Sequence, residues 1–251
     1  MANFDQDRLS RTGAGVREAA IDQGLRSYML SVYNYMAAGL AITGIVAWFA
    51  FQAAVQQTVD GALTLSPFGV ALYTSALKWV VLFAPLGLVF FLSARIGRMS
   101  VSAAQISFWV FAGLMGLSLS SAFLVYTGTS ITQTFFVTAI AFGSLSLYGY
   151  TTKRDLSAFG SFLFMGLIGI IVASLVNLFL QSSALQFAVS VIGVLLFAGL
   201  TAYDTQRIKE MYWEGDGTAV MGKKAIMGAL ALYLDFINMF MFLLQFMGDR
   251  R

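Results

Sequence analysis

Residues 225–247 read AIMGALALYLDFINMFMFLLQFM, a nearly continuous apolar run that contains one charged residue, Asp235. At about 1.5 Å of rise per residue, a helix of this length crosses the roughly 30 Å hydrocarbon core of a bilayer. Six earlier segments have the same character, so the chain has seven candidate spans: 28–54, 78–94, 103–126, 132–150, 160–180, 185–212 and 225–247. We therefore predict an all-α polytopic membrane protein, a bundle of seven transmembrane helices.

The composition of the chain supports a lipid environment and excludes several kinds of site. Of 251 residues, 59% are hydrophobic and 11% are charged, whereas a soluble domain has about a quarter of its residues charged. The chain has no Cys and no His, which excludes disulfides, thiolate metal sites, cysteine nucleophiles and an imidazole pH switch. No motif indicates a bound cofactor, and nothing indicates nucleic-acid binding. We predict a polar, flexible tail over residues 1–24 and a single transmembrane domain over residues 25–251.

The basic residues predict the orientation of the spans. Of the 15 Lys and Arg residues, twelve fall on the N-terminal side of the membrane in this arrangement, which is then the cytoplasmic side. They are Arg8, Arg11, Arg17, Arg26, Arg95, Arg98, Lys153, Arg154, Arg207, Lys209, Lys223 and Lys224. Arg250 and Arg251 lie on the other side, so either a short basic tail is tolerated there or the last span does not fully cross. We favour seven full spans in a bacterial cytoplasmic membrane.

Two carboxylates interrupt the apolar runs, Asp204 in the sixth span and Asp235 in the seventh. Charged residues inside a span are costly and usually functional. Asp204 lies nine residues from the interfacial Trp213, roughly 13 Å inward, and Asp235 lies eleven residues from Lys224, roughly 16 Å inward. The two spans are joined by a short loop and run antiparallel, so the carboxylates are expected at similar depth.

Each aspartate lies on a small or polar stripe that is expected to face the bundle interior. Thr201 accompanies Asp204, and Asn238 and Gln245 follow Asp235 at helical spacing. If the stripes oppose each other, the carboxyl groups would share a proton and titrate as a unit, which makes a pH sensor without histidine. Once ionised, the pair would attract a hard cation such as Ca²⁺, but two carboxylates are too few for a tight site, so only transient binding is expected.

Less specific interpretations remain open for these residues. Asp204 could pair locally with the following Arg207, and Asp235 could form a structural hydrogen bond to another helix. Arg95 and Arg98 could be topology anchors only. Alternatively, one of the two arginines could reach inward as the counter-charge of the aspartates.

The sequence around the aspartates resembles a known family. Residues 199–206 (GLTAYDTQ) and 231–238 (ALYLDFIN) resemble the paired signatures of the Bax inhibitor-1 family, also known as transmembrane Bax inhibitor motif proteins. Residues 146–156 (SLYGYTTKRDL) are similar to its central loop and residues 22–29 (DQGLRSYM) to its entry into the first span. The resemblance covers the chain after about Ile21 and is closer to the bacterial, YccA-like branch.

The resemblance implies both a fold and a function. It implies that the last helix is central and wrapped by the other six. It also implies that Asp204 and Asp235 match the family's paired aspartates, a pH-sensitive latch on a calcium leak. An arginine on the second helix is implicated as well, and either Arg98 or Arg95 could match it. Family members are associated with suppression of cell death, and bacterial ones with modulation of a membrane-bound protease.

Three functions follow, in decreasing order of preference. The first is a pH-sensitive calcium leak channel gated by the aspartate pair, with Ca²⁺ and protons as its ligands. The second is a non-conducting regulatory protein that binds another membrane protein, such as a membrane protease, through its N-terminal tail. The third is a cation/proton antiporter. An intramembrane aspartyl hydrolase also uses two Asp residues on adjacent helices, but the recognised motifs argue against an enzyme.

Overall fold

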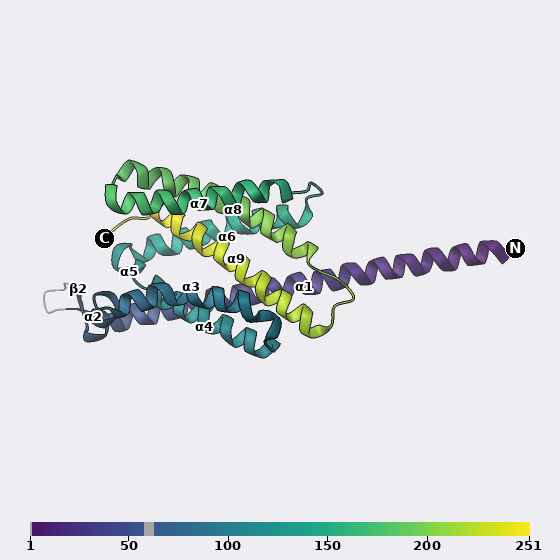
Figure 1. The fold of residues 1–251 in the computed structure, drawn as a ribbon, viewed down its shortest axis with the longest axis horizontal. Helices are drawn as coiled ribbons and strands as arrows, with labels where there is room; N and C mark the ends of the chain where they lie inside the picture. The colour runs from purple at the N-terminus through teal and green to yellow at the C-terminus, as the bar shows by residue number, and fades with distance from the viewer. Residues whose placement is uncertain (1, 58–62) are drawn as a thin grey trace.

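The computed structural model describes the backbone of residues 2–57 and 63–251, and the side chains of residues 22–57 and 63–251. Seven helical stretches in these ranges are long and apolar enough to cross a membrane, which confirms the predicted class. They lie in α1 (Ala2–Ala54), α3 (Leu77–Arg95) with the short η1 (Ile96–Arg98), α4 (Val101–Leu119) with α5 (Ala122–Val125), α6 (Gly128–Thr151), α7 (Ser157–Leu180), α8 (Ser183–Glu210) and α9 (Thr218–Met247). Figure 1 shows the long helices lying roughly side by side.

The connection between the first two spans contains structure that hydropathy did not predict. Strands β1 (Val55–Gln57) and β2 (Leu63–Leu65) pair antiparallel, and the short helix α2 (Pro67–Tyr73) follows them. Ser66 caps α2, because its Oγ accepts a hydrogen bond of 3.1 Å from the backbone N–H of Gly69. These elements lie at the end of the bundle opposite the N-terminus (Figure 1).

The predicted spans 160–180 and 185–212 leave a break at residues 181–184, which carry no charge, and the structure confirms this break. Gln181 ends α7 in a left-handed conformation with φ 48°, a common way to terminate a helix. Ser182 then caps α8 by accepting a hydrogen bond of 3.3 Å from the backbone N–H of Leu185. The Asn177 side chain accepts the backbone N–H of Ser182 at 3.0 Å, so this turn is held from both sides.

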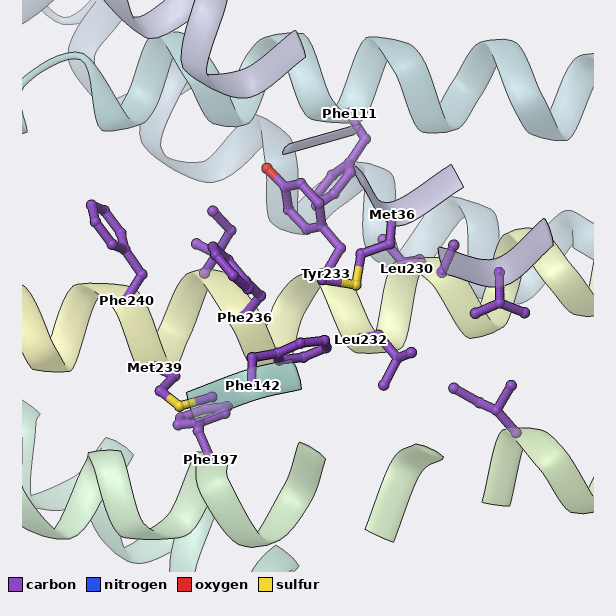
Figure 2. Close-up of a cluster of buried hydrophobic side chains, with 14 of the residues drawn as sticks. Met36, Phe111, Phe142, Phe197, Leu230, Leu232, Tyr233, Phe236, Met239 and Phe240 are labelled. Carbon is purple, nitrogen blue, oxygen red and sulfur yellow. The ribbon is translucent and has the colours of Figure 1, made fainter. Parts of the chain in front are cut away.

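Helix α9 is the central element, as the resemblance implied. In its most apolar stretch 67% of the residues are buried, against 11% in α3 and in α7. It packs directly on α1, α4, α6 and α8, while α3 and α7 pack mainly on α4 and α8. Figure 2 shows the apolar side chains that project from α9, among them Tyr233, Phe236 and Phe240, and the side chains that meet them.

The last helix does cross the bundle completely. The chain after α9 meets the turn between α5 and α6, where the backbone N–H of Thr127 donates to the Asp249 carbonyl at 3.1 Å and that of Arg251 to the Val125 carbonyl at 2.9 Å. The Arg251 guanidinium lies 5.6 Å from the ring centroid of Phe51. The two C-terminal arginines therefore lie at the end of the bundle opposite most basic residues.

The predicted tail continues the first helix. The backbone of residues 2–24 is the first part of α1, which extends beyond the other helices (Figure 1). The side chains of residues 1–21 lie outside the described residues. The flexibility of this tail therefore stays a prediction.

Candidate functional site

A cavity of about 1090 Å³ lies between α7, α8 and α9, and Leu86 of α3 borders it. Most of its wall is apolar, and the cavity opens at the surface of the bundle, since Phe164 and Met165 of its wall are 62% and 70% exposed. The exceptions are Ser161 and Ser174 of α7, Tyr203, Asp204 and Arg207 of α8, and Asp235 and Asn238 of α9. Both aspartates singled out in the sequence therefore lie on one cavity.

The two aspartate side chains meet at this wall. Asp235 is only 4% exposed, whereas Asp204 is partly accessible from the cavity. The carboxyl groups lie within hydrogen-bonding reach of each other. A carboxylate can only accept, so a hydrogen bond between the two groups requires a proton on one of them.

One carboxyl oxygen of Asp235 lacks a hydrogen-bond partner in the described part of the chain. This oxygen, Oδ2, is buried and receives no hydrogen bond from the described residues. Leaving a charged oxygen without a donor in a buried position is costly. A proton held between the carboxyl groups, or a cation, would remove that cost.

The position of Asp204 is set by polar contacts on the other side of α8. The hydroxyls of Thr205 and Ser146 are 2.9 Å apart, and the Tyr33 hydroxyl lies 2.6 Å from that of Ser146. The next residue, Gln206, accepts the Leu156 N–H and donates to the Arg154 carbonyl, both at 2.8 Å. These contacts tie α8 to α1, α6 and the loop before α7, and they leave Asp204 facing the cavity.

A glycine allows α6 and α8 to approach this closely. A Cβ on Gly149 would collide with the carbonyl oxygen of Ala202, which lies two residues before Asp204. Small residues that admit a neighbouring backbone are typical of helix contacts in membranes. Gly149 belongs to the stretch SLYGYTTKRDL, which resembles the family's central loop. This stretch therefore packs directly against α8, the helix that carries Asp204.

The three polar residues expected beside the aspartates have different surroundings. Asn238 lines the cavity and its Nδ2 donates to the Leu234 carbonyl at 2.8 Å. Thr201 is fully buried, does not line the cavity, and donates to the Phe197 carbonyl of its own helix at 2.7 Å. Gln245 lies further along α9, where its Oε1 is 3.4 Å from the hydroxyl of Ser190.

Among the described residues, the arginine that borders the cavity of the aspartate pair is Arg207. It lines the cavity and interacts electrostatically with Asp204, three residues before it on α8. Arg95 ends α3 and Arg98 ends η1; both are exposed and neither lines the cavity. Among the described residues no ion pair or hydrogen bond joins Arg207 to Asp204, so the local pairing considered for Asp204 amounts to an electrostatic attraction only.

The described residues offer no closed metal site. Across residues 22–57 and 63–251, no group of three or more His, Cys, Asp or Glu side chains could hold a metal ion together. Calcium prefers six to eight oxygen ligands, so the aspartate pair could supply only part of a coordination shell. Water or carbonyl oxygens would have to complete it.

One further aspartate, Asp155, lies outside the spans. Asp155 is in the loop before α7, and its Oδ1 accepts the Ser157 backbone N–H at 2.8 Å. Hydrogen bonds from Ser157, from the side chain and from the backbone, lower the pKa of Asp155. This carboxylate is exposed and does not border the cavity, which makes it a useful reference for the buried pair.

Comparisons with known proteins agree with the motif resemblance. A family model described as inhibitor of apoptosis-promoting Bax1 matches residues 25–251. The protein RP147 of Rickettsia prowazekii is 48% identical over 94% of both chains. The inner membrane protein YbhL of Escherichia coli is 47% identical over 98% of this chain and 100% of its own. A Caulobacter vibrioides protein is 45% identical over the full length of both.

The family match covers the whole transmembrane bundle, including both helices that carry the aspartates. The similarity to these relatives extends over nearly the full length of both chains, so it is not confined to one segment. This chain belongs to the Bax inhibitor-1 family of membrane proteins.

Proposed function

We propose that this protein is a pH-sensitive calcium leak channel of the Bax inhibitor-1 type, gated by Asp204 and Asp235. One observation carries the proposal: two carboxyl groups from neighbouring helices meet on the wall of one large cavity between the helices of a membrane domain. A buried acidic pair is costly to keep in a span, which favours a functional role over a purely structural one.

The chemistry of the pair links protons to calcium. With one proton, the two groups form a hydrogen bond and carry a single negative charge between them. Without it, two adjacent anions repel each other in a poorly solvated site. A hard cation such as Ca²⁺ relieves that repulsion, because carboxylate oxygens are its preferred ligands. Protons and calcium therefore compete for the same oxygens, and the occupancy of the site depends on pH.

A weak site suits permeation better than storage. An ion must bind well enough to enter a pathway and loosely enough to leave it. Two carboxylates supply few of the ligands that calcium needs, so exchange at Asp204 and Asp235 is expected to be fast. No resident cofactor is part of this proposal, and calcium is the cargo.

The proposed location is the bacterial cytoplasmic membrane, with the N-terminus in the cytoplasm. The E. coli relative is named an inner membrane protein. At the N-terminal end of the bundle, Lys209 donates to the Tyr150 carbonyl and Lys223 to the Gly97 carbonyl, so basic side chains of separate spans gather there. Lys and Arg are enriched on the cytoplasmic side of membrane proteins.

Calcium flux in vesicles tests the proposal. Purified protein is reconstituted into liposomes that hold a calcium dye, and flux is followed over a range of pH. Native protein is compared with Asp204→Asn, Asp235→Asn, Asp155→Asn and empty vesicles. The asparagine amide can donate a hydrogen bond to the remaining carboxylate at any pH, as the protonated aspartate does at acidic pH. The calcium flux of each of the first two variants should therefore be independent of pH and equal to the flux of native protein at acidic pH. Asp155→Asn removes an exposed carboxylate and should behave as native protein.

The same vesicles separate the competing functions. Flux no greater than that of empty vesicles, from folded protein, would reject the leak and favour a non-conducting regulator that binds another membrane protein. A pH dye inside the vesicles identifies an antiporter, because calcium entry would then be accompanied by stoichiometric proton exit. Calcium entry without such proton exit supports a channel.

A further inference from the structure

A second cavity of about 530 Å³ lies further along α7, α8 and α9, toward the C-terminal end of α9. Its wall differs in chemistry from that of the first cavity. Among the described residues, none that borders it is charged, and it instead carries amide side chains, those of Asn177, Gln181, Gln186 and Gln245. Amide carbonyl oxygens are neutral ligands for hard cations. The cavity that holds the aspartates is called the inner cavity below, and this second one the outer cavity.

Three residues border both cavities and therefore lie between them: Ser174 and Leu178 of α7 and Phe242 of α9. Phe242 is the largest of the three. On α9 it follows Asn238, which lines the inner cavity, by four residues, and it precedes Gln245, which lines the outer cavity, by three. The polar stripe predicted on α9 is thus interrupted by one aromatic ring, at the boundary between the two cavities.

The Phe242 ring is held in a defined place. It stacks on Phe197 of α8, with ring centroids 5.9 Å apart and 27° between the planes. Figure 2 shows the Phe197 side chain directed from α8 toward α9. On its other contact, Phe242 lies over Gly193, where an added Cβ would come within 2.6 Å of the ring. The glycine therefore makes room for the aromatic ring at this level.

We propose that Phe242 is a hydrophobic gate between the inner and the outer cavity. An apolar constriction expels water, and an ion without water crosses it poorly. Leu178 of α7 borders both cavities but is 69% exposed, so the Phe242 ring is the group that would separate the water at the aspartate pair from the water at the amide groups. This inference rests on the proposed function, since it assigns the closed point of the same pathway.

The absence of cysteine from the chain allows an accessibility test that needs no calcium. Single variants Asn238→Cys and Gln245→Cys are exposed to a charged, membrane-impermeant thiol reagent added to the outside of intact cells. Gln245→Cys should react. Asn238→Cys should be protected in the otherwise native protein, and its reaction should become at least about tenfold faster when Phe242→Ala is added, because water then reaches it.

Phe240→Ala is the matched control. Phe240 lies on the same helix and is 8% exposed, but it borders neither cavity. When Phe240→Ala is combined with Asn238→Cys, the cysteine should still be protected from the thiol reagent. If Phe242→Ala fails to fold, as judged by elution in detergent, Phe242→Ser and Phe242→Leu take its place. The serine is expected to expose position 238 and the leucine to keep it protected.

Two results overturn the gate. One is equal reaction of Asn238→Cys with and without Phe242, and the other is its continued protection in folded Phe242→Ala. The outcome is independent of calcium. If accessibility changes as expected while no protein conducts calcium in vesicles, the gate stands and the proposed cargo is wrong. If calcium flux follows the aspartates but accessibility does not follow Phe242, the leak stands and the gate does not.

Discussion

The two faces of α9 differ in how they treat buried polar groups, as two residues only two positions apart in the sequence show. Tyr233, on the face toward α1 and α4, and Asp235, on the face toward the cavity, are 0% and 4% exposed. The Tyr233 hydroxyl has a partner, because it lies 2.6 Å from that of Thr43. Asp235 Oδ2 has no donor among the described residues. We call the side of α9 that carries Tyr233 the packed face and the side that carries Asp235 the open face. The polar group on the packed face has a hydrogen-bond partner within the protein. The carboxyl oxygen on the open face would need a proton or a cation as its partner.

The surroundings of the two residues differ in the same way. On the packed face, the Tyr233 ring meets Phe111 and Phe108 edge-on, with centroids 5.1 and 6.1 Å apart. Thr43 in turn donates to the Ala112 carbonyl at 2.9 Å. The open face borders a cavity of about 1090 Å³ instead. The comparison indicates that one face of the central helix holds the bundle together, while the other keeps space and charge available for function.

The largest expected effect is on the packed face. Phe111 is fully buried, so Phe111→Ala should lower the free energy of unfolding by about 3–5 kcal/mol, the usual loss for a large side chain from a core. Denaturation in detergent measures it. Phe164→Ala, which removes a 62% exposed ring that borders the cavity, should cost less than about 1 kcal/mol. Equal losses would contradict the distinction between the faces.

A smaller effect is expected from the hydroxyl pair. Thr43→Val preserves shape but leaves the Tyr233 hydroxyl buried without its partner. The free energy of unfolding should fall by about 1–3 kcal/mol. The pH dependence of calcium flux should not change, because Thr43 does not border the inner cavity. A variant with native stability, or with altered pH dependence, would show that the two faces are not separate.

The open face should respond in the opposite direction. Asp235→Leu replaces a buried carboxyl group by an apolar side chain of similar size, and it should raise the free energy of unfolding by about 1 kcal/mol. The same change should abolish calcium flux, a trade of function for stability that is common at active sites. Destabilisation comparable to that of Phe111→Ala would identify Asp235 as structural.

The smallest effect concerns the arginines. Removal of a positive charge beside Asp204 favours the protonated pair, so Arg207→Gln should move the midpoint of the pH-dependent flux upward. The shift should be less than about one pH unit, since Arg207 is exposed and screened by solvent. Arg95→Gln and Arg98→Gln should leave the midpoint unchanged. A shift produced by either of these two instead would assign the counter-charge to the second span.

The spans and the aspartate pair could be predicted because both depend on local pattern. An apolar run of sufficient length has few alternatives to a spanning helix. Depth and helical periodicity predict that Asp204 and Asp235 lie close together, and in the structure their carboxyl groups are within hydrogen-bonding reach. The central position of α9 came from the family resemblance rather than from its composition, which is no more apolar than that of α7.

Other features depend on tertiary packing and could not be predicted. Periodicity places Thr201 on the stripe of Asp204, but a threonine in a helix can satisfy its hydroxyl on the preceding turn, and Thr201 does so. The docking of the C-terminal residues on the turn at Tyr126 joins segments more than a hundred residues apart. The division of one polar stripe into two cavities by Phe242 requires the position of α7, which no local pattern provides.

Infrared difference spectroscopy of the purified protein tests the central claim most directly, because it detects a protonated carboxyl group. Exposed aspartates have a pKa of about 3.9, so near neutral pH they contribute no such signal. We expect a protonated carboxyl band at that pH in native protein. The band should be lost on titration to alkaline pH or on addition of calcium, and it should be absent from Asp204→Asn and Asp235→Asn. A native spectrum without the band, or a band that survives in both variants, would contradict a proton shared between these two aspartates.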